Sequence, residues 1–219
     1  MLTKNLISTD IIPLRTSDTG EQAIATMNVF HVRHLPIVNH EMLLGMISED
    51  DILNFNLDEA IGSYLTAFTG HFCTEKDHIF EAMQKMGDFR LSVIPVIDRD
   101  EKYLGMITLE NILHFFTKNY GLSEPGSILM LERDRSDYSL SEISRIIEGE
   151  GGVIIASFIN TNVLSSKLQI SLKISTNSLG RIIASLQRFE YTLIGTFTKE
   201  EYEDGMKHRY DSLMTYLNL

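Results

Sequence analysis

Nine residues, Gly45–Leu53, have the sequence GMISEDDIL, and the pattern returns at Gly105–Leu113 as GMITLENIL. Upstream of each copy lies a short apolar run that contains a proline, HLPIV at 34–38 and VIPVI at 93–97. The offset between the copies stays close to 60 residues. Self-similarity at a fixed period indicates one structural unit built twice, in which each copy covers an apolar face of the other. We therefore expect two related clefts, and we look for function there.

The residues around each copy predict the same order of elements: turn, helix, strand, short loop, strand and helix. In the first copy we expect Asp18 to cap the helix, with Glu21 three residues later. This order, the strand Leu35–Val38 and the Gly-x-x-Ser-x-x-Asp run at 45–51 resemble a CBS domain, the module named after cystathionine β-synthase. The resemblance covers both copies and implies a tandem CBS pair, with repeat 1 at residues 1–60 and repeat 2 at residues 61–120.

The second half of the chain has a different pattern. Residues 121–126, GLSEPG, are typical of a linker because they combine glycine and proline with polar residues. Strands are predicted near 127–133, 153–159, 166–174 and 191–197, and helices near 140–147 and 179–189. This βαββαβ order predicts a ferredoxin-like domain at residues 127–198. Residues 199–219 are expected to form a polar C-terminal helix.

The fold class predicted for the whole chain is thus α+β (mixed α/β). A ferredoxin-like domain after a CBS pair resembles an ACT domain, a regulatory module that often binds amino acids at a dimer interface. The layout resembles the bacterial CBS–ACT proteins of acetoin utilisation. Many amino-acid-binding ACT domains have glycine where this chain has Asp137, so a purely dimer-forming role is an equal alternative. The alternating segment Lys167–Ile174 is expected to lie at a sheet edge or on the sheet face that meets a partner.

Composition argues against several functional classes. The chain of 219 residues carries a net charge of −11, whereas nucleic acids and anionic membranes attract basic surfaces. The lone cysteine, Cys73, excludes an internal disulfide, and the histidines do not form a metal-binding pattern. The sequence lacks a membrane-spanning apolar run and a signal-like N-terminus, so we expect a cytoplasmic protein. Because no catalytic constellation is visible, we do not expect an enzyme.

Ser48 and Asp51 have two compatible interpretations. Ser-x-x-Asp before a helix is a capping box, which needs no ligand. In CBS domains, however, the matching serine or threonine and aspartate hold the ribose hydroxyls of an adenosine nucleotide. A carboxylate accepts two hydrogen bonds from vicinal hydroxyls, and the adjacent helix N-terminus suits phosphate. The resemblance therefore implies ribose binding at this pair.

Thr108 and Asn111 form the matching pair in the second repeat. Asn111 stands where the family pattern has aspartate, so the charge and the two-fold acceptance are lost. We expect this cleft to be the weaker one, or selective for another ligand, or empty. Further candidates for base or phosphate contacts come from the apolar strands and from the residues before them; all can equally be core or solvated loop residues. They are Ile12, Arg33, His34, Pro36 and Met46 around the first site, and Arg90, Pro95 and Met106 around the second.

The sequence thus predicts a non-catalytic regulatory protein whose CBS pair binds an adenine nucleotide such as AMP, ADP or ATP, or another adenosine derivative. The ACT-like domain would provide dimerisation or bind a second effector. We expect a homodimer, and a target enzyme as a further partner. The alternative is a structural assembly module with empty clefts that binds a partner enzyme.

Overall fold

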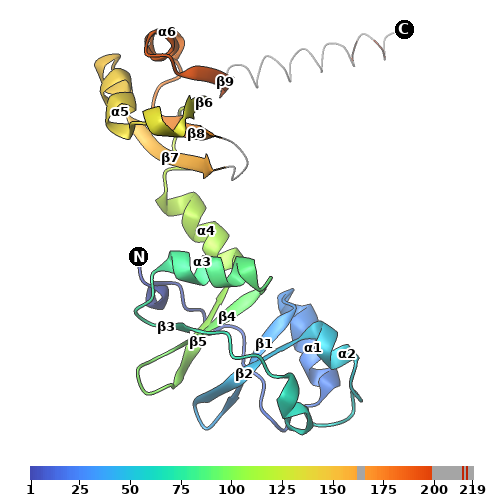
Figure 1. The fold of residues 1–219 in the computed structure, drawn as a ribbon. Helices are drawn as coiled ribbons and strands as arrows, with labels where there is room; N and C mark the ends of the chain where they lie inside the picture. Colours follow the sequence, from blue (N-terminus) through green and yellow to red (C-terminus); the bar gives the residue numbers. More distant parts are fainter. Residues whose placement is uncertain (162–165, 199–213, 215, 217–219) are drawn as a thin grey trace. The chain divides into compact units, whose positions relative to one another are not determined.

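The computed structural model describes residues 1–161, 166–198, 214 and 216. The chain divides into two compact units, Met1–Phe115 and Phe116–Leu219. Figure 1 draws both units, and each is described by itself. The division falls within a helix, a few residues before the linker predicted at 121–126. The helix predicted for residues 199–219 lies outside the described residues, apart from Met214 and Tyr216, which are helical.

The first repeat forms one helix, a β-hairpin and a short second helix. The long helix is capped by Thr19 and Gln22 in a reciprocal capping box, and not by Asp18 and Glu21 as the sequence predicted. Asp18 instead accepts a hydrogen bond from the backbone N–H of Arg15, so its side chain closes the preceding turn. The elements are η1 (Thr3–Asn5), α1 (Gly20–Phe30), β1 (His34–Asn39), β2 (Met42–Ser48), α2 (Glu49–Leu53) and η2 (Ile61–Ala67).

The second repeat follows the same order. Its first strand is short and contains the buried Cys73, where burial raises the pKa of the thiol to about 11. Strand pairing is equivalent in the two hairpins, since Pro36 lies opposite Met46 and Pro95 lies opposite Met106. The elements are β3 (Cys73–Thr74), α3 (Ile79–Asp88), β4 (Val93–Ile97), β5 (Tyr103–Thr108) and α4 (Leu109–Asn119).

The second strand of each hairpin pairs with a short segment from outside that hairpin, which we call a crossing segment. The segment around Ser8 pairs with β5, and the segment around Thr69 pairs with β2. Ser8 pairs with Met106, and Thr69 pairs with Met46, through reciprocal backbone hydrogen bonds of 2.9–3.1 Å. The glycines of the repeated motif allow this approach. Gly105 has φ +145°, and a Cβ there would lie 2.8 Å from the carbonyl oxygen of Ser8. The N-terminal segment is therefore part of the second repeat's cleft, although it precedes the first repeat in sequence.

The second unit is a four-stranded antiparallel sheet with strand order β7-β8-β6-β9. This is the ferredoxin-like order that the sequence predicted, and the mixed α+β fold class is confirmed. Helices α5 and α6 lie on one side of the sheet (Figure 1). The elements are β6 (Ser127–Asp134), η3 (Arg135–Asp137), α5 (Leu140–Gly149), β7 (Ile154–Thr161), β8 (Lys167–Ile174), α6 (Gly180–Arg188) and β9 (Thr192–Phe197).

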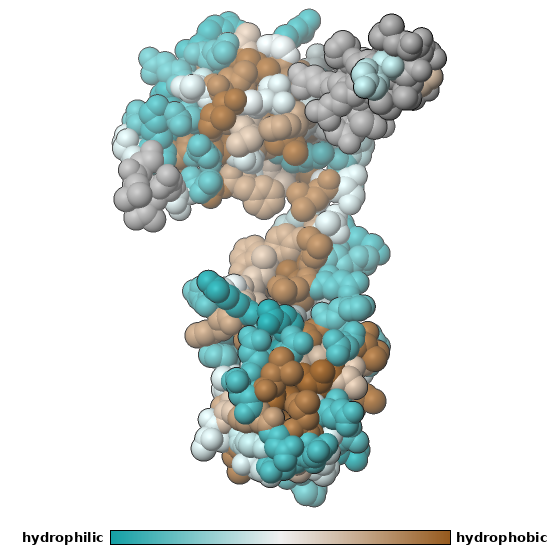
Figure 2. Space-filling view, turned by 90° about the vertical axis from the view of Figure 1, so that its right-hand side faces the viewer, coloured by the Kyte–Doolittle hydropathy of each residue, from teal (hydrophilic) through white to brown (hydrophobic). Residues whose placement is uncertain are grey.

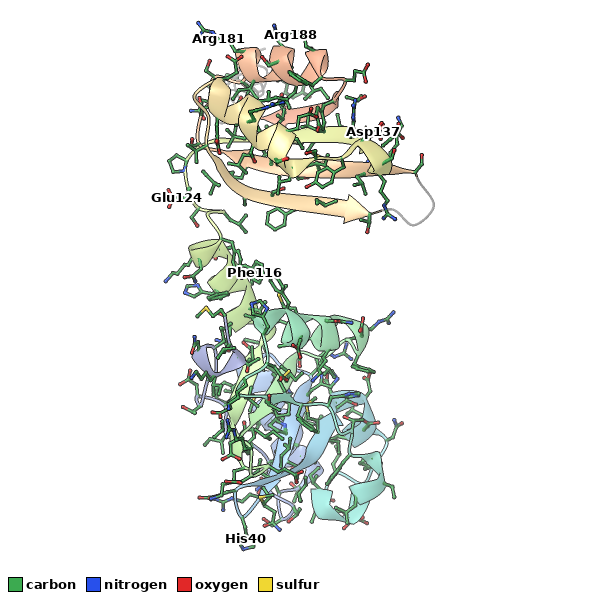
Figure 3. The ribbon with its side chains drawn as sticks, turned by 60° about the vertical axis from the view of Figure 1, so that its left-hand side comes forward. His40, Phe116, Glu124, Asp137, Arg181 and Arg188 are labelled. Atoms are coloured by element: carbon green, nitrogen blue, oxygen red, sulfur yellow. The ribbon has the colours of Figure 1, made fainter. Side chains whose placement is uncertain are left out.

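The alternation in β8 decides which face of this sheet is buried. Leu168, Ile170, Leu172 and Ile174 are all buried, and they join residues of α5 and α6 in one core. Polar residues of α6, including Arg181 and Arg188, lie on the outer surface of that helix (Figure 3). Because β8 lies between β7 and β6, the prediction that it forms a sheet edge is wrong; the edges are β7 and β9.

Candidate functional site

Ser48 and Asp51 form the capping box that the sequence predicts at the start of α2. The Ser48 hydroxyl accepts a hydrogen bond from the backbone N–H of Asp51 at 3.1 Å, and Oδ2 of Asp51 accepts from the backbone N–H of Ser48 at 3.3 Å. The same Oδ2 also accepts from the Ser48 hydroxyl. Among the described residues, Oδ1 of Asp51 has no hydrogen-bond partner, so one carboxylate oxygen stays available to a ligand.

Thr108 and Asn111 repeat this geometry before α4. Oδ1 of Asn111 accepts from the backbone N–H of Thr108 at 3.1 Å and from its hydroxyl at 2.9 Å, and the Thr108 hydroxyl accepts from the backbone N–H of Asn111 at 3.0 Å. The amide oxygen is therefore used by the cap, and the side-chain NH₂ is the group left for a ligand. An NH₂ group donates hydrogen bonds, so Asn111 can bind a ribose hydroxyl whose oxygen accepts the bond.

A cavity of about 230 Å³ lies at the Thr108–Asn111 pair. Four parts of the first unit form its walls: the N-terminal segment around Ser8, the end of α1, Ser92 just before β4, and the start of α4. The volume is enough for the ring system of a ligand, and because the cavity is open to solvent, the rest of a larger ligand can extend out of it. Its lining residues are Ser8, Asp10, Ile11, Phe30, His31, Val32, Ser92, Thr108, Leu109, Glu110 and Asn111.

In the sister cleft, at Ser48 and Asp51, different side chains stand at the positions that line the cavity in the second copy. His71 lies two residues after Thr69, as Asp10 lies two residues after Ser8. The His71 ring stacks on Phe89, with ring centroids 3.9 Å apart and an interplanar angle of 27°. Phe89 directly follows α3, in the repeat position that Phe30 holds at the end of α1, so His71 stacks on the residue that matches the cavity-lining Phe30.

Arg33 forms ion pairs with two carboxylates at the start of α2, beside the same cleft. Its Nε lies 3.1 Å from the Glu49 carboxylate, and its Nη2 lies 3.1 Å from the Asp50 carboxylate. The side chain is 63% exposed, so these ion pairs are weak in free energy. They nevertheless direct the guanidinium, predicted as a phosphate contact, toward the first turn of α2. The Arg33 guanidinium therefore lies at the helix start that Ser48 caps.

His34 connects the two repeats at this point. Its Nδ1 accepts a hydrogen bond from the backbone N–H of Ser92 at 3.2 Å and lies 3.1 Å from the Ser92 hydroxyl. Burial lowers the pKa of the imidazole, and the neighbouring Arg33 charge lowers it further, although Asp51 and Asp50 oppose the shift. His34 is thus held as a neutral acceptor in the structure.

The other predicted contact residues are mostly core or distant from the cavity. Pro36, Met46, Pro95 and Met106 are buried in the two hairpins and do not line the cavity. Ile12 is 72% exposed and borders a separate surface hollow with the tip of the β1–β2 hairpin. Arg90 is exposed with φ +54° just after α3, in the position that His31 holds after α1.

The sequence reasoning missed Asp10 and Phe30, which line the cavity together with the predicted Thr108 and Asn111. Both belong to the first repeat in sequence but to the second repeat's cleft in space. The signal was present: Ser8 and Thr69 are 61 residues apart and mark the crossing segment in each copy. The cavity also lies at the Asn111 copy, whereas the sequence favoured the Asp51 copy as the stronger site.

Residues 4–58 and 71–118 match the family model of the CBS domain, so the predicted tandem CBS pair is confirmed. The chain is 26% identical over 128 residues to the homoserine O-acetyltransferase of Methanococcus vannielii, and 22% identical over 216 residues to the inosine-5′-monophosphate dehydrogenase of Methanocaldococcus jannaschii. These alignments cover 53% and 93% of this chain. The chain spans only 25% and 40% of the length of these two relatives.

Solved structures also match this chain over about half of its length. A CBS domain pair/ACT domain protein from Thermotoga maritima is 18% identical with a TM-score of 0.48, and the match covers 54% of this chain and 98% of that one. A CBS domain pair in complex with 5′-methylthioadenosine and S-adenosyl-L-methionine is 24% identical with a TM-score of 0.43, covering 53% and 95%. The ACT-like nature of the second unit and the acetoin-type layout stay predictions.

Within the part of the chain that the structure describes, no group of three or more histidine, cysteine, aspartate or glutamate residues is placed to hold a metal ion. None of the helices in residues 1–161 and 166–198 has the length and apolar character needed to cross a bilayer.

Proposed function

We propose that this chain is a non-catalytic regulatory sensor that binds an adenosine derivative in the cleft at Thr108 and Asn111. CBS pairs are regulatory, nucleotide-binding modules. The observation that carries the proposal is the open cavity of about 230 Å³ at the second copy of the capping motif, beside an aromatic residue and a helix N-terminus. The paired hydroxyl and amide supply the polar contacts that a ribose requires.

The sister cleft at Ser48 and Asp51 is proposed to be the weaker site in the native protein, because its own His71–Phe89 stack occupies it. One ligand per chain is therefore expected. The second unit is proposed as an ACT-like module that provides dimerisation or binds a second effector, and the regulated partner as a target enzyme. The competing function is an assembly module whose clefts stay empty.

A matched pair of substitutions tests the site. Asn111→Asp keeps the capping geometry, since Asp51 makes the same bonds in the sister copy. It adds a charged acceptor for a ribose hydroxyl, so we expect adenosine to bind about five-fold more tightly, the scale of one charge-assisted hydrogen bond over a neutral one. The converse change, Asp51→Asn, should leave adenosine affinity unchanged because that cleft is filled.

Isothermal titration calorimetry of the full chain with adenosine, AMP, ATP and S-adenosylmethionine provides the measurement. Thermal shift gives a second readout, because a ligand that binds only the native state raises the unfolding temperature with concentration. Binding of one ligand per chain that responds to Asn111→Asp and not to Asp51→Asn supports the proposal. The absence of binding by all four compounds at millimolar concentration would favour the assembly module.

A further inference from the structure

The charges around the open cleft are unusual for a site that would hold phosphate. Asp10 and Glu110 both contribute to the lining, and among the described lining residues there is a single histidine, His31, and neither lysine nor arginine. Two carboxylates at the mouth of a cleft repel a phosphate group and attract a cation. Asp10 is kept in place by the Ser8 hydroxyl, which donates to its Oδ2 at 3.0 Å.

The helix N-terminus in this cleft is also neutralised. The backbone N–H groups at the start of a helix attract anions, but α4 carries Glu110 in its first turn. The arginines that could offset such charges are associated with the sister copy. Arg33 pairs with Glu49 and Asp50 there, and Arg90 stands where the open cleft has His31. The two clefts therefore differ in charge as well as in the side chains at the matching positions, Asp10 in one and His71 in the other.

The sister cleft shows what kind of ring the open cleft accepts. The heteroaromatic His71 ring stacks on Phe89 at a centroid distance of 3.9 Å. The matching Phe30 is 39% exposed and lines the cavity, with the smaller Asp10 in the position of His71. Phe30 thus offers a partly exposed ring on which a planar heterocycle can stack, as His71 does on Phe89.

From these contacts we infer that the cleft at Thr108 and Asn111 selects adenosine derivatives that carry no phosphate and have a neutral or positively charged 5′ substituent. The base stacks on Phe30, and the carboxylates of Asp10 and Glu110 discriminate against 5′-phosphates. This inference rests on the proposed function, because it specifies the ligand class of the same cleft. It makes Asp10 and Glu110 specificity residues, distinct from the ribose-binding pair.

Calorimetry with five probes tests the inference: adenosine, 5′-methylthioadenosine, S-adenosylmethionine, AMP and ATP. We expect the three phosphate-free compounds to bind at least tenfold more tightly than AMP and ATP at low ionic strength, with a smaller ratio at high salt. AMP or ATP binding as tightly as adenosine would overturn the inference and leave the proposed function standing. If none of the five binds, the proposed function fails as well.

The double substitution Asp10→Asn and Glu110→Gln removes both charges and keeps the size of each side chain. It should lower the preference for S-adenosylmethionine over AMP, measured as the ratio of their affinities, by about tenfold. The matched control is Asp100→Asn in the β4–β5 loop, which removes a carboxylate outside the cavity and should leave the preference as it is. An unchanged preference in the double variant, with adenosine still bound, would overturn the inference.

Discussion

A ring nitrogen makes one of the contacts between the two CBS repeats, because Nδ1 of His34 accepts the backbone N–H of Ser92. Protonation at Nδ1 removes this acceptor and places a positive charge beside Arg33 and near His71, with Asp50 and Asp51 as the opposing charges. The pKa of His34 in the folded chain lies below its ordinary value of 6.5, owing first to burial and then to Arg33. The native state therefore binds fewer protons than the unfolded state in this window.

We expect the free energy of unfolding to fall as the pH is lowered from about 6.5 through the folded-state pKa of His34. His34→Asn keeps an acceptor near the position of Nδ1 and cannot titrate, so its stability should depend less on pH in this range. Urea denaturation followed by circular dichroism at pH 7.5, 6.5 and 5.5 measures the difference. His40→Asn is the control, since His40 lies at the tip of the β1–β2 hairpin (Figure 3). Equal pH dependence in all three proteins would contradict this role.

At the same scale, the sequence could predict the local chemistry of a motif but not its surroundings. The capping geometry of Ser48 and Asp51 is dictated by residues three apart, and it was predictable. The filling of that cleft by His71 depends on a contact with Phe89, 18 residues away, and on the path of the crossing segment. Such a contact has no local signature, so the ranking of the two clefts could not be derived from sequence.

Among the elements, the crossing segments depend most on single glycines. Gly105→Ala places a Cβ 2.8 Å from the Ser8 carbonyl oxygen and forces an alanine to φ +145°. We expect a loss of about 2 kcal/mol in the free energy of unfolding, the scale of a strained backbone position. Gly87→Ala is the matched control, because it lies in α3 with open space around its Cα and should stabilise the chain by about 0.5–1 kcal/mol. Chemical denaturation distinguishes the two signs; a loss for both or a gain for both would disagree with the described backbone.

The elements themselves were largely predictable because their periodicity is strong. Leu168 to Ile174 alternate over the whole of β8, and the helical spacing of α5 places Ile143, Ile146 and Ile147 in the same core. What could not be predicted is the lateral order of strands. Nothing local distinguishes a central strand from an edge strand when one face is apolar. The sequence therefore allows Lys167–Ile174 either a sheet edge or a partner-facing sheet face, and the edge alternative is wrong because β8 lies between β7 and β6.

For the whole molecule, the exposed apolar surface of the first unit indicates association. Figure 2 shows apolar side chains gathered on one face of this unit. Leu113 on α4 is 67% exposed, Val29 on α1 is 70% exposed and Phe80 on α3 is 53% exposed. These three residues lie on three different helices, and contiguous exposed apolar surface of the kind seen in Figure 2 marks interaction sites. A second copy of this chain is the partner that the sequence predicts.

We therefore expect a homodimer, with twice the chain mass by light scattering at low micromolar concentration. A specific dimer buries roughly 1,200–2,000 Å² in total, so one charge introduced at the centre of the interface should weaken it strongly.

Leu113→Glu places a carboxylate on the exposed face of α4 and should shift the mass toward the monomer. The control is Leu65→Glu in η2, where the leucine is 60% exposed on a 3-10 segment outside helices α1–α4. A monomer mass for the wild type would contradict the dimer, and an unchanged dimer mass for Leu113→Glu would show that the interface does not depend on this face of α4. Since the cleft lining includes the first turn of α4, a dimer through this helix would place the ligand site near the subunit contact and let binding influence association.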